Sequence, residues 1–480
     1  MLPKTLKYGS KVESALARST RINIAPQNGT GNYVLGDTII LNIPTRNNLV
    51  LAPTESYLKF TGTFTSTAAN NAFRWDSCGS HGLIQRVRVF HGSNLLQDLD
   101  NYGLLAKILF DLQQPTDSTF GKQSLLAGTR TDTVTQFQAV TTADATDLAT
   151  AQTLANSLKG VLNSGRIPSY QVNSGERIGG DRTALLANAG TVSETYCLNL
   201  ISLVGSLSSS NYIPLFAMTS APLRVEIQLV SSFIQACSEL AGGTSTISLS
   251  NVEYIANFIE LGDAAMSVIY GSLEGQPLQY VVPDFRNYQY TATIPDNTVT
   301  QITMPIPAKF SSLKSLLVSS RDKGTGTLTF FPFSSVTLGL RDYQFRIGSQ
   351  IMPPKVPTTI GEFWAELCKA YGSIADIIYT PSIDKLSYSL SASVATNDSA
   401  TNVSSSSSGS FYIGIDLENY VATDKSSIFA GFNSNTDDIF LTLNYNAVNR
   451  GGVNLTARWD AFANFDCVLV CENNTAYVKF

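Results

Sequence analysis

Residues 82–112 read GLIQRVRVFHGSNLLQDLDNYGLLAKILFDL and predict a strand, a turn and a helix in quick succession. Val87 and Val89 point to one face of the first segment, while Arg86 and Arg88 point to the other. Alternation with a period of two residues is typical of a β-strand with one face buried. The stretch therefore predicts a half-buried strand that ends at a Gly-Ser turn and leads to a helix.

A second stretch repeats this order, because residues 340–372 read LRDYQFRIGSQIMPPKVPTTIGEFWAELCKAYG. Its strand also ends in Gly-Ser, and the two glycines, Gly92 and Gly348, lie 348 − 92 = 256 residues apart. In both stretches an apolar stripe at three- and four-residue spacing predicts a helix. The stripe residues are Tyr102, Leu105, Leu109 and Leu112, then Ile360, Phe363, Trp364, Leu367 and Tyr371. Thr359 and Glu362 match the capping-box pattern that begins a helix.

Four more pairs of blocks recur in the same order: TIILNIP with QITMPIP, TYCLNLISL with FYIGIDLEN, IPLFAMTSAPLRVEIQL with SIFAGFNSNTDDIFLTL, and NVEYIANFIEL with FDCVLVCENNT. The offset is 307 − 44 = 263 at Pro44 and Pro307, but 439 − 225 = 214 at Val225 and Ile439. The drop of 256 − 214 = 42 residues indicates extra chain in the first copy, which we assign to a Thr- and Ala-rich loop at 113–192.

We predict an all-β chain of two tandem β-sandwiches, each with a short helix after an early strand. The predicted division is a basic N-terminal arm at 1–30, a first sandwich at 31–264 with the loop insert at 113–192, a linker at 265–283, and a second sandwich at 284–480. Four residues are expected to break regular structure in the linker: Gly271, Gly275, Pro277 and Pro283. One helix is expected inside the insert, near 143–162. Eight strands in each copy would make each a jelly roll, although periodicity alone fits other sandwiches as well.

The composition is polar but weakly charged, with 43% hydrophobic and only 14% charged residues. About 25% charged residues is typical of soluble proteins. A surface of Ser, Thr, Asn and Gln suits a protein that buries its sides against neighbours, and it equally suits an ordinary sandwich with Thr-rich strands. The formal net charge of −5 gives no global basic field that would indicate nucleic-acid binding.

The N-terminus departs from this balance and is basic. Its cations are Lys4, Lys7, Lys11, Arg18 and Arg21, against the single acid Glu13. Such an arm could contact phosphates or an anionic membrane surface, and the alternative is a frayed terminus. It lacks the apolar run and cleavage site of a secretory signal. No apolar run in the chain approaches the ~18–20 residues needed to span a bilayer.

Candidates for catalysis or metal binding are scarce. The six cysteines are scattered without a CxxC pair, and Cys467 and Cys471 lie too far apart along one predicted strand to bond each other. The only histidines, His81 and His91, are expected at strand ends, and the common catalytic motifs are absent. We therefore predict no enzyme activity, no catalytic or metal site and no cofactor.

The duplicated plan, together with GLIQRVRVFHGSNLLQDLDNY and IPLFAMTSAPLRVEIQL, resembles the major capsid proteins of the double jelly-roll, adenovirus-like lineage of tailless icosahedral DNA viruses. The resemblance implies two eight-stranded jelly rolls per chain. It also implies homotrimers that form pseudo-hexameric capsomers and tile an icosahedral shell around the genome.

Partners and location follow from the same resemblance. The implied partners are neighbouring capsomers and penton, minor capsid or cement proteins, with no small-molecule substrate. The arm residues Lys4, Lys7, Lys11, Arg18 and Arg21 would face an internal membrane or the genome. The implied location is the virion, made and assembled inside the host cell.

A secreted or surface carbohydrate-binding or carbohydrate-active β-sandwich is the alternative. A signal peptide, paired cysteines or exposed aromatic platforms would favour it. The tryptophans are Trp75, Trp364 and Trp459, and Trp364 lies on the apolar stripe of a predicted helix, where core packing explains it better. A periplasmic or surface-layer protein is disfavoured by the missing export signal.

Overall fold

A computed structural model describes residues 17–29, 31–67, 73–115, 118, 122–128, 191–204, 212–239, 244–322, 332–371, 374, 381–383, 385–390, 409–418 and 430–480. The helix predicted near 143–162, most of the insert at 113–192, and Lys4, Lys7 and Lys11 lie outside these residues.

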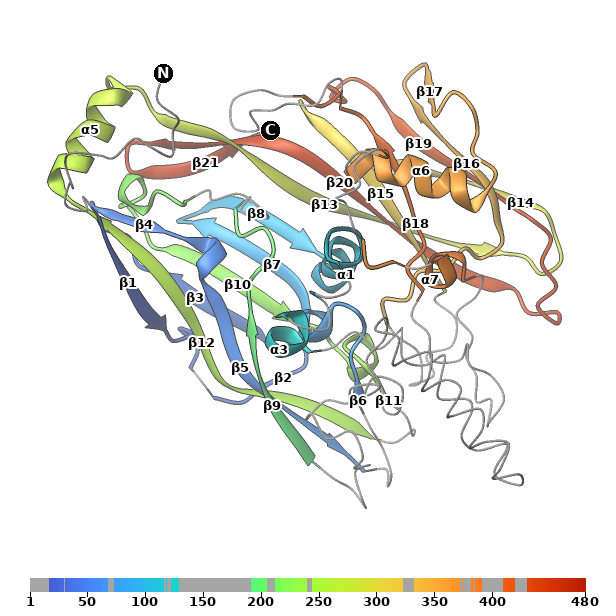
Figure 1. Cartoon of the computed structure of the whole chain (residues 1–480), viewed down its shortest axis with the longest axis horizontal. Coiled ribbons are helices and arrows are strands. Elements are labelled where there is room, and N and C mark those ends of the chain that lie inside the picture. Colours follow the sequence, from blue (N-terminus) through green and yellow to red (C-terminus); the bar gives the residue numbers. More distant parts are fainter. Residues whose placement is uncertain are drawn as a thin grey trace, which may run out of the picture.

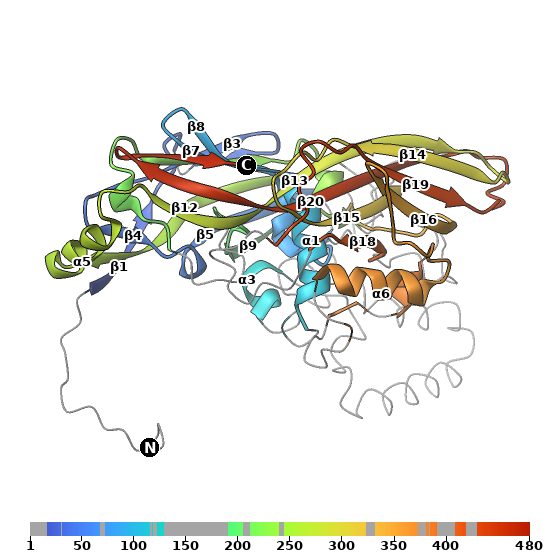
Figure 2. The same ribbon diagram turned by 90° about the horizontal axis from the view of Figure 1, so that it is seen from above.

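The first half of the chain folds into two antiparallel sheets that face each other (Figures 1 and 2). One sheet has the strand order β1-β12-β5-β9, with β2 and β4 also paired to β12, and the other has the order β3-β10-β7-β8. The bounds are β1 (Ala17–Ile24), β2 (Tyr33–Val34), β3 (Thr38–Ile43), β4 (Leu49–Leu51), β5 (Tyr57–Ser66), β7 (Ile84–His91), β8 (Asn94–Asp100), β9 (Thr191–Leu198), β10 (Leu223–Leu229) and β12 (Ser245–Leu261). A separate short ribbon pairs β6 (Phe73–Arg74) with β11 (Ser238–Glu239).

The second half repeats the order of eight of these strands, in two sheets of four. Its sheets have the orders β13-β20-β15-β18, with β21 paired to β20, and β14-β19-β16-β17. The bounds are β13 (Leu278–Ile294), β14 (Thr300–Ile306), β15 (Leu313–Asp322), β16 (Leu340–Ile347), β17 (Gln350–Met352), β18 (Tyr412–Asp416), β19 (Ile439–Tyr445), β20 (Leu455–Glu472) and β21 (Thr475–Lys479). The predicted duplication of an all-β plan is confirmed. Strands β12, β13 and β20 are the long strands of the two sandwiches, with 17, 17 and 18 residues.

The strand ladders correct one predicted correspondence between the halves. Val225 lies opposite Val89, and Leu441 lies opposite Phe345, so β10 and β19 correspond at an offset of 441 − 225 = 216. The sequence comparison paired Val225 with Ile439, two residues too early. A shift of two residues keeps every side chain on the same face of a strand, so alternation cannot detect it.

The Gly-Ser turns and the helices appear where they were predicted. Gly92 and Gly348 have φ of 58° and 56°, a left-handed conformation that glycine adopts without steric cost. Each turn closes a hairpin, β7 with β8 and β16 with β17, before α1 (Tyr102–Gln113) and α6 (Ile360–Tyr371) begin. The hairpin strands β8 and β17 were not assigned from the sequence. The capping box is confirmed, because the Thr359 N–H donates to Glu362 Oε2 at 3.1 Å and the Glu362 N–H donates to Thr359 Oγ1 at 3.3 Å.

The connection between the halves is more regular than predicted. Gly271 lies inside α5 (Asp263–Leu273) and Pro283 lies inside β13, so the expectation that these two residues interrupt regular structure is wrong. Proline is tolerated in β13 because this strand lies at the edge of its sheet, where one backbone side needs no ladder partner. Residues 17–24 of the predicted arm form β1, the edge strand beside β12.

Apolar residues of both halves merge into one continuous core. Helix α1 lies between the halves, and α3 (Ser124–Ala127), α6 and α7 (Lys385–Ser389) are the other helices of this region (Figure 1). Figure 2 shows α1, α3 and α6 on the same side of the molecule. The two halves therefore pack as one body around α1.

Candidate functional site: the seam between the two halves

The surface that joins the halves contains buried clusters of charged and polar side chains. We define the seam as the contact of α1, β7 and β8 in the first half with β13, β18, β20 and β21 in the second (Figure 1). Ten of the twelve residues of α1 are buried. A helix that is apolar around most of its circumference is typical of a helix enclosed by protein on all sides.

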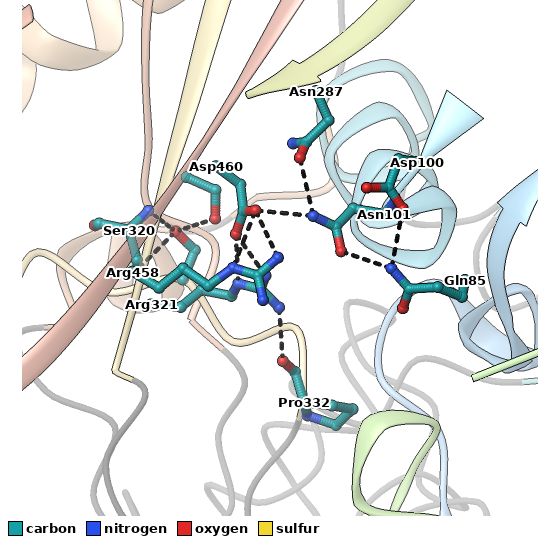
Figure 3. Close-up of polar contacts among 11 residues, drawn as sticks. Gln85, Asp100, Asn101, Asn287, Ser320, Arg321, Pro332, Arg458 and Asp460 are labelled. Carbon is teal, nitrogen blue, oxygen red and sulfur yellow. Dashed lines mark hydrogen bonds and ion pairs between the residues drawn. The ribbon is translucent and has the colours of Figure 1, made fainter. Parts of the chain in front are cut away.

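Asp460, on β20, is the centre of one seam cluster (Figure 3). Its fully buried carboxylate accepts hydrogen bonds from Arg321 Nε at 3.0 Å and Arg458 Nη2 at 3.0 Å, both from the second half. From the first half, Asn101 Nδ2 donates to Asp460 Oδ1 at 2.9 Å and to Asn287 Oδ1 at 3.0 Å. Charge-assisted bonds of this kind are among the stronger ones in proteins, so the cluster holds the halves in one fixed orientation.

The backbone conformation of Asn101 directs its side chain toward Asp460. It precedes α1 with φ of 51°, a left-handed conformation that asparagine adopts more readily than most residues. Its side-chain oxygen accepts from Gln85 Nε2 at 3.2 Å, and the same nitrogen donates to Asp100 Oδ1 at 3.2 Å. The Asn101 amide is therefore oriented from its own half before it reaches Asp460 (Figure 3).

Lys107, on α1, is the centre of a second cluster that is completely buried. Its ammonium lies 3.3 Å from Asp76 Oδ1 and 3.1 Å from Asp111 Oδ2. Asp111 Oδ2 also accepts from the hydroxyls of Ser410 at 2.7 Å and Tyr412 at 2.8 Å, both in the second half. A buried charge that loses its partners raises the free energy of the folded state strongly. Displacement of the second half from α1 would remove the hydroxyl partners of Asp111 and is therefore unfavourable.

Two further contacts extend the seam along β8. Gln97 Nε2 donates to Asp284 Oδ1 on β13 at 2.8 Å. Burial raises the pKa of Asp284 to about 7, although the bond from Gln97 acts in the opposite direction. Near the start of β8, Asn94 Nδ2 donates to the carbonyl of Ala476 at 3.0 Å, and the Ala476 N–H donates to His91 Nδ1 at 3.1 Å.

Comparison with known proteins identifies the architecture. No model of a protein family matches the chain, and no curated protein sequence matches it. Solved structures do match along nearly the full length. The mavirus major capsid protein has a TM-score of 0.55 at 11% identity, over 100% of this chain and 95% of its own. The Faustovirus major capsid protein has a TM-score of 0.57 at 9% identity, over 97% of this chain and 93% of its own. A chain of the PBCV-1 virus capsid has a TM-score of 0.55 at 11% identity, over 99% of this chain and 100% of its own.

The chain is a double jelly roll. Eight strands of each half, in two sheets of four, share one order, which is the arrangement of a jelly roll. The predicted fold is thus confirmed, and so is the structural resemblance to double jelly-roll capsid proteins of tailless icosahedral viruses.

The two described residues of the predicted basic arm lie away from the seam of the double jelly roll. Of the five, Arg18 and Arg21 are described, and both are exposed on β1, at the edge of the first half opposite α1 (Figure 1). The Arg21 guanidinium contacts Tyr57, with a hydrogen bond to its hydroxyl and a distance of 5.2 Å to its ring centroid.

Both histidines and five of the six cysteines of the double jelly roll are buried. His81 Nδ1 lies 3.1 Å from the Tyr102 hydroxyl, and burial lowers the pKa of His81 to about 3, so the ring is neutral. All six cysteines are described and none forms a disulfide, and Cys467 and Cys471 both lie in β20. Among the described residues no group of three or more His, Cys, Asp or Glu could hold a metal ion, and no helix is long and apolar enough to cross a membrane.

Sequence reasoning treated α1 as an apolar stripe and missed its charged members. Lys107 and Asp111 are spaced i, i+4 within YGLLAKILFDLQ, where nearly every other residue is apolar. A charge pair inside a helix that is apolar all round is a signal of a buried ion pair. Asp460 and Asn101 carried no such signal, because their partners come from distant strands.

Proposed function

We propose that this double jelly roll is a viral major capsid protein and that three copies form one pseudo-hexameric capsomer. The observation that supports the proposal is the repetition of one strand order in two halves that are joined by hydrogen bonds to the buried carboxylates of Asp111 and Asp460. Two similar barrels per chain and three chains per ring would place six similar barrels around one axis. The proposed role is structural and not enzymatic.

The seam supports this role because the two barrels of a capsid subunit must keep a fixed orientation relative to each other. A small or flexible interface would let the barrels rotate against each other. The low charge of the chain, 14% of residues, limits repulsion between many identical neighbours.

We extend the proposal to partners and location. Neighbouring capsomers, penton proteins and minor or cement proteins would contact the trimer within the virion. The division into an arm, two jelly rolls and a linker is part of the proposal. The insert at 113–192 would serve as an outward crown or a clamp between capsomers. The basic residues Lys4, Lys7, Lys11, Arg18 and Arg21 would face the membrane or genome.

The mass of the purified full chain in solution tests the function. We expect a stable trimer of three times 51.7 kDa by light scattering, with hexagonal outlines in negative-stain micrographs. A chain that stays monomeric at every concentration contradicts the proposal. A monomer that also binds members of a glycan array would instead support the carbohydrate-binding alternative.

A further inference from the structure

The outer face of the sheet β13-β20-β15-β18 is buried by the seam. Asp460, Ser319 and Tyr412 are neighbours in one row across β20, β15 and β18. All three have no exposed surface. The α1 region binds both ends of this row, Asn101 at Asp460 and Asp111 at Tyr412. In the second half, therefore, the face is covered by α1 of the first half and, beside Gly414, by α6 of its own half.

The corresponding face of the first half is open to solvent in the single chain. Strands β5 and β15 each have ten residues and start 313 − 57 = 256 apart, so Thr63 corresponds to Ser319. Nine hydroxyl side chains form a regular array there, which we name the hydroxyl face. Its rows are Ser250–Thr61–Thr195, Ser248–Thr63–Ser193 and Thr246–Thr65–Thr191. All nine are exposed or half-exposed.

Neighbouring hydroxyls of this face bind each other along the sheet. The Thr61–Thr195, Thr63–Ser193 and Thr65–Thr191 oxygen pairs lie 3.1, 3.0 and 3.2 Å apart. Each hydroxyl has one proton and two lone pairs, so the array can both donate and accept toward a partner laid over it. The nine side chains carry no charge and are ordered by these bonds, and the next row on the same side of the sheet holds the Lys59–Glu253 ion pair.

The helices differ in the opposite sense to the sheet faces, because α1 of the first half is buried and α6 of the second half is mostly exposed or half-exposed. Both have twelve residues, and they start 360 − 102 = 258 apart. Only three residues of α6 are buried, Phe363, Leu367 and Cys368, whereas ten are buried in α1. At this offset Asp111, which binds Tyr412, corresponds to the exposed Lys369. The free side of α6 thus corresponds to the side of α1 that makes the seam.

We infer that α6 of one molecule packs on the hydroxyl face of the next, so that the seam inside the chain is repeated between chains. The inference rests on the proposed trimer and names its contact surfaces. The occupant is a second copy of this chain, because the seam already shows what covers this sheet face in the other half. In place of the Asp111 carboxylate, the Lys369 ammonium would donate to hydroxyl oxygens around Thr63. The contact is head-to-tail, and three of them close a ring.

Matched threonine substitutions test the surface. Thr63→Arg places a bulky charge at the centre of the hydroxyl face. Thr303→Arg, the control, changes an exposed threonine of β14 that is also paired to a threonine across its sheet, Thr442, at 3.4 Å. We expect the Thr63 variant to sediment as a monomer of 51.7 kDa and the Thr303 variant to remain trimeric. Equal thermal unfolding transitions would show that both variants are folded.

A mixing experiment tests the head-to-tail geometry. Ala365→Arg blocks α6 while leaving the hydroxyl face intact, and the Thr63 variant has the opposite defect. Each variant alone should be monomeric, and their mixture should form a one-to-one complex of two times 51.7 kDa by native mass spectrometry. If both variants remain trimeric while the unmodified chain is a trimer, the surface is wrong and the capsid proposal stands. A mixture that stays monomeric rules out the head-to-tail contact, and an unmodified chain that is monomeric overturns the function itself.

Discussion

Asp460 accepts hydrogen bonds from both halves of the chain, so at the residue scale it is the clearest test of the seam. We expect Asp460→Ala to lower the free energy of unfolding by about 3–5 kcal/mol, because Arg321 and Arg458 lose the partner of their buried contact. Chemical denaturation measures this change. Asp438→Ala is the matched control, since Asp438 pairs with Lys309 on the exposed surface and should matter little. Equal losses in both variants would contradict a special role for the seam.

Asp284 makes the stability of the folded chain depend on pH. Burial raises its pKa to about 7, whereas the unfolded chain has the ordinary value of about 4. The folded state therefore keeps a proton that the unfolded state releases, so stability falls as pH rises from about 4 to about 7 and then levels off. Asp284→Asn removes this loss and keeps an oxygen that can accept from Gln97.

We expect the melting temperature of the Asp284→Asn variant, relative to the unmodified chain, to be higher at about pH 8 than at about pH 5. Differential scanning fluorimetry at both values measures this difference. Asp416 and Asp466, whose pKa values burial also raises, are present in both proteins and cancel. A difference that is constant with pH would show that Asp284 does not titrate in this range.

At the element scale, α1 and α6 are corresponding helices of the two halves, and one is buried while the other is mostly exposed or half-exposed. Gly103 and Gly361 hold equivalent second positions, at the 258-residue offset. A Cβ at Gly103 would lie 2.7 Å from Phe333 Cζ of the second half, while a Cβ at Gly361 would meet nothing within 4 Å. We expect Gly103→Ala to destabilise the chain by about 1–3 kcal/mol through overpacking. Gly361→Ala should be neutral or stabilise it by up to about 1 kcal/mol. Denaturant titration of the two variants measures both, and equal effects would contradict the packing of Phe333 against α1.

Elements with a local pattern could be predicted from the sequence. The alternation in β7 and β16, the glycine turns after them and the Thr359–Glu362 cap are each determined by residues a few positions apart. The strand β8 and the helix α5 were missed. NLLQDLD alternates poorly, and DAAMSVIYGSL buries only Met266 and so carries little periodic signal. The seam itself could not be predicted, because Asn101 and Asp460 are 359 residues apart and meet only after both barrels have formed.

At the scale of the whole molecule, the start of β1 at Ala17 allows truncations that separate an effect on vesicle binding from an effect on trimer formation. Removing residues 1–16 keeps β1 paired to β12, so we expect trimers of unchanged mass. The shortened chain should bind anionic vesicles more weakly, because it lacks Lys4, Lys7 and Lys11. Co-sedimentation with vesicles and light scattering measure the two properties. Removal of residues 1–24 is the comparison, since it also deletes the edge strand. Loss of trimers after the shorter truncation would place the arm within the capsomer.

The fusion of two barrels in one chain also affects how such a protein can diversify. In a ring of six identical barrels, every substitution recurs at all six contacts and has to suit each of them. In the proposed trimer a substitution recurs at alternate barrels only. The row Asp460–Ser319–Tyr412 and its counterpart Ser248–Thr63–Ser193 differ accordingly, with a charged and aromatic set on one side and hydroxyls on the other. Each barrel is thereby released from the symmetry of the ring, and its side chains evolve separately while the strand order is kept.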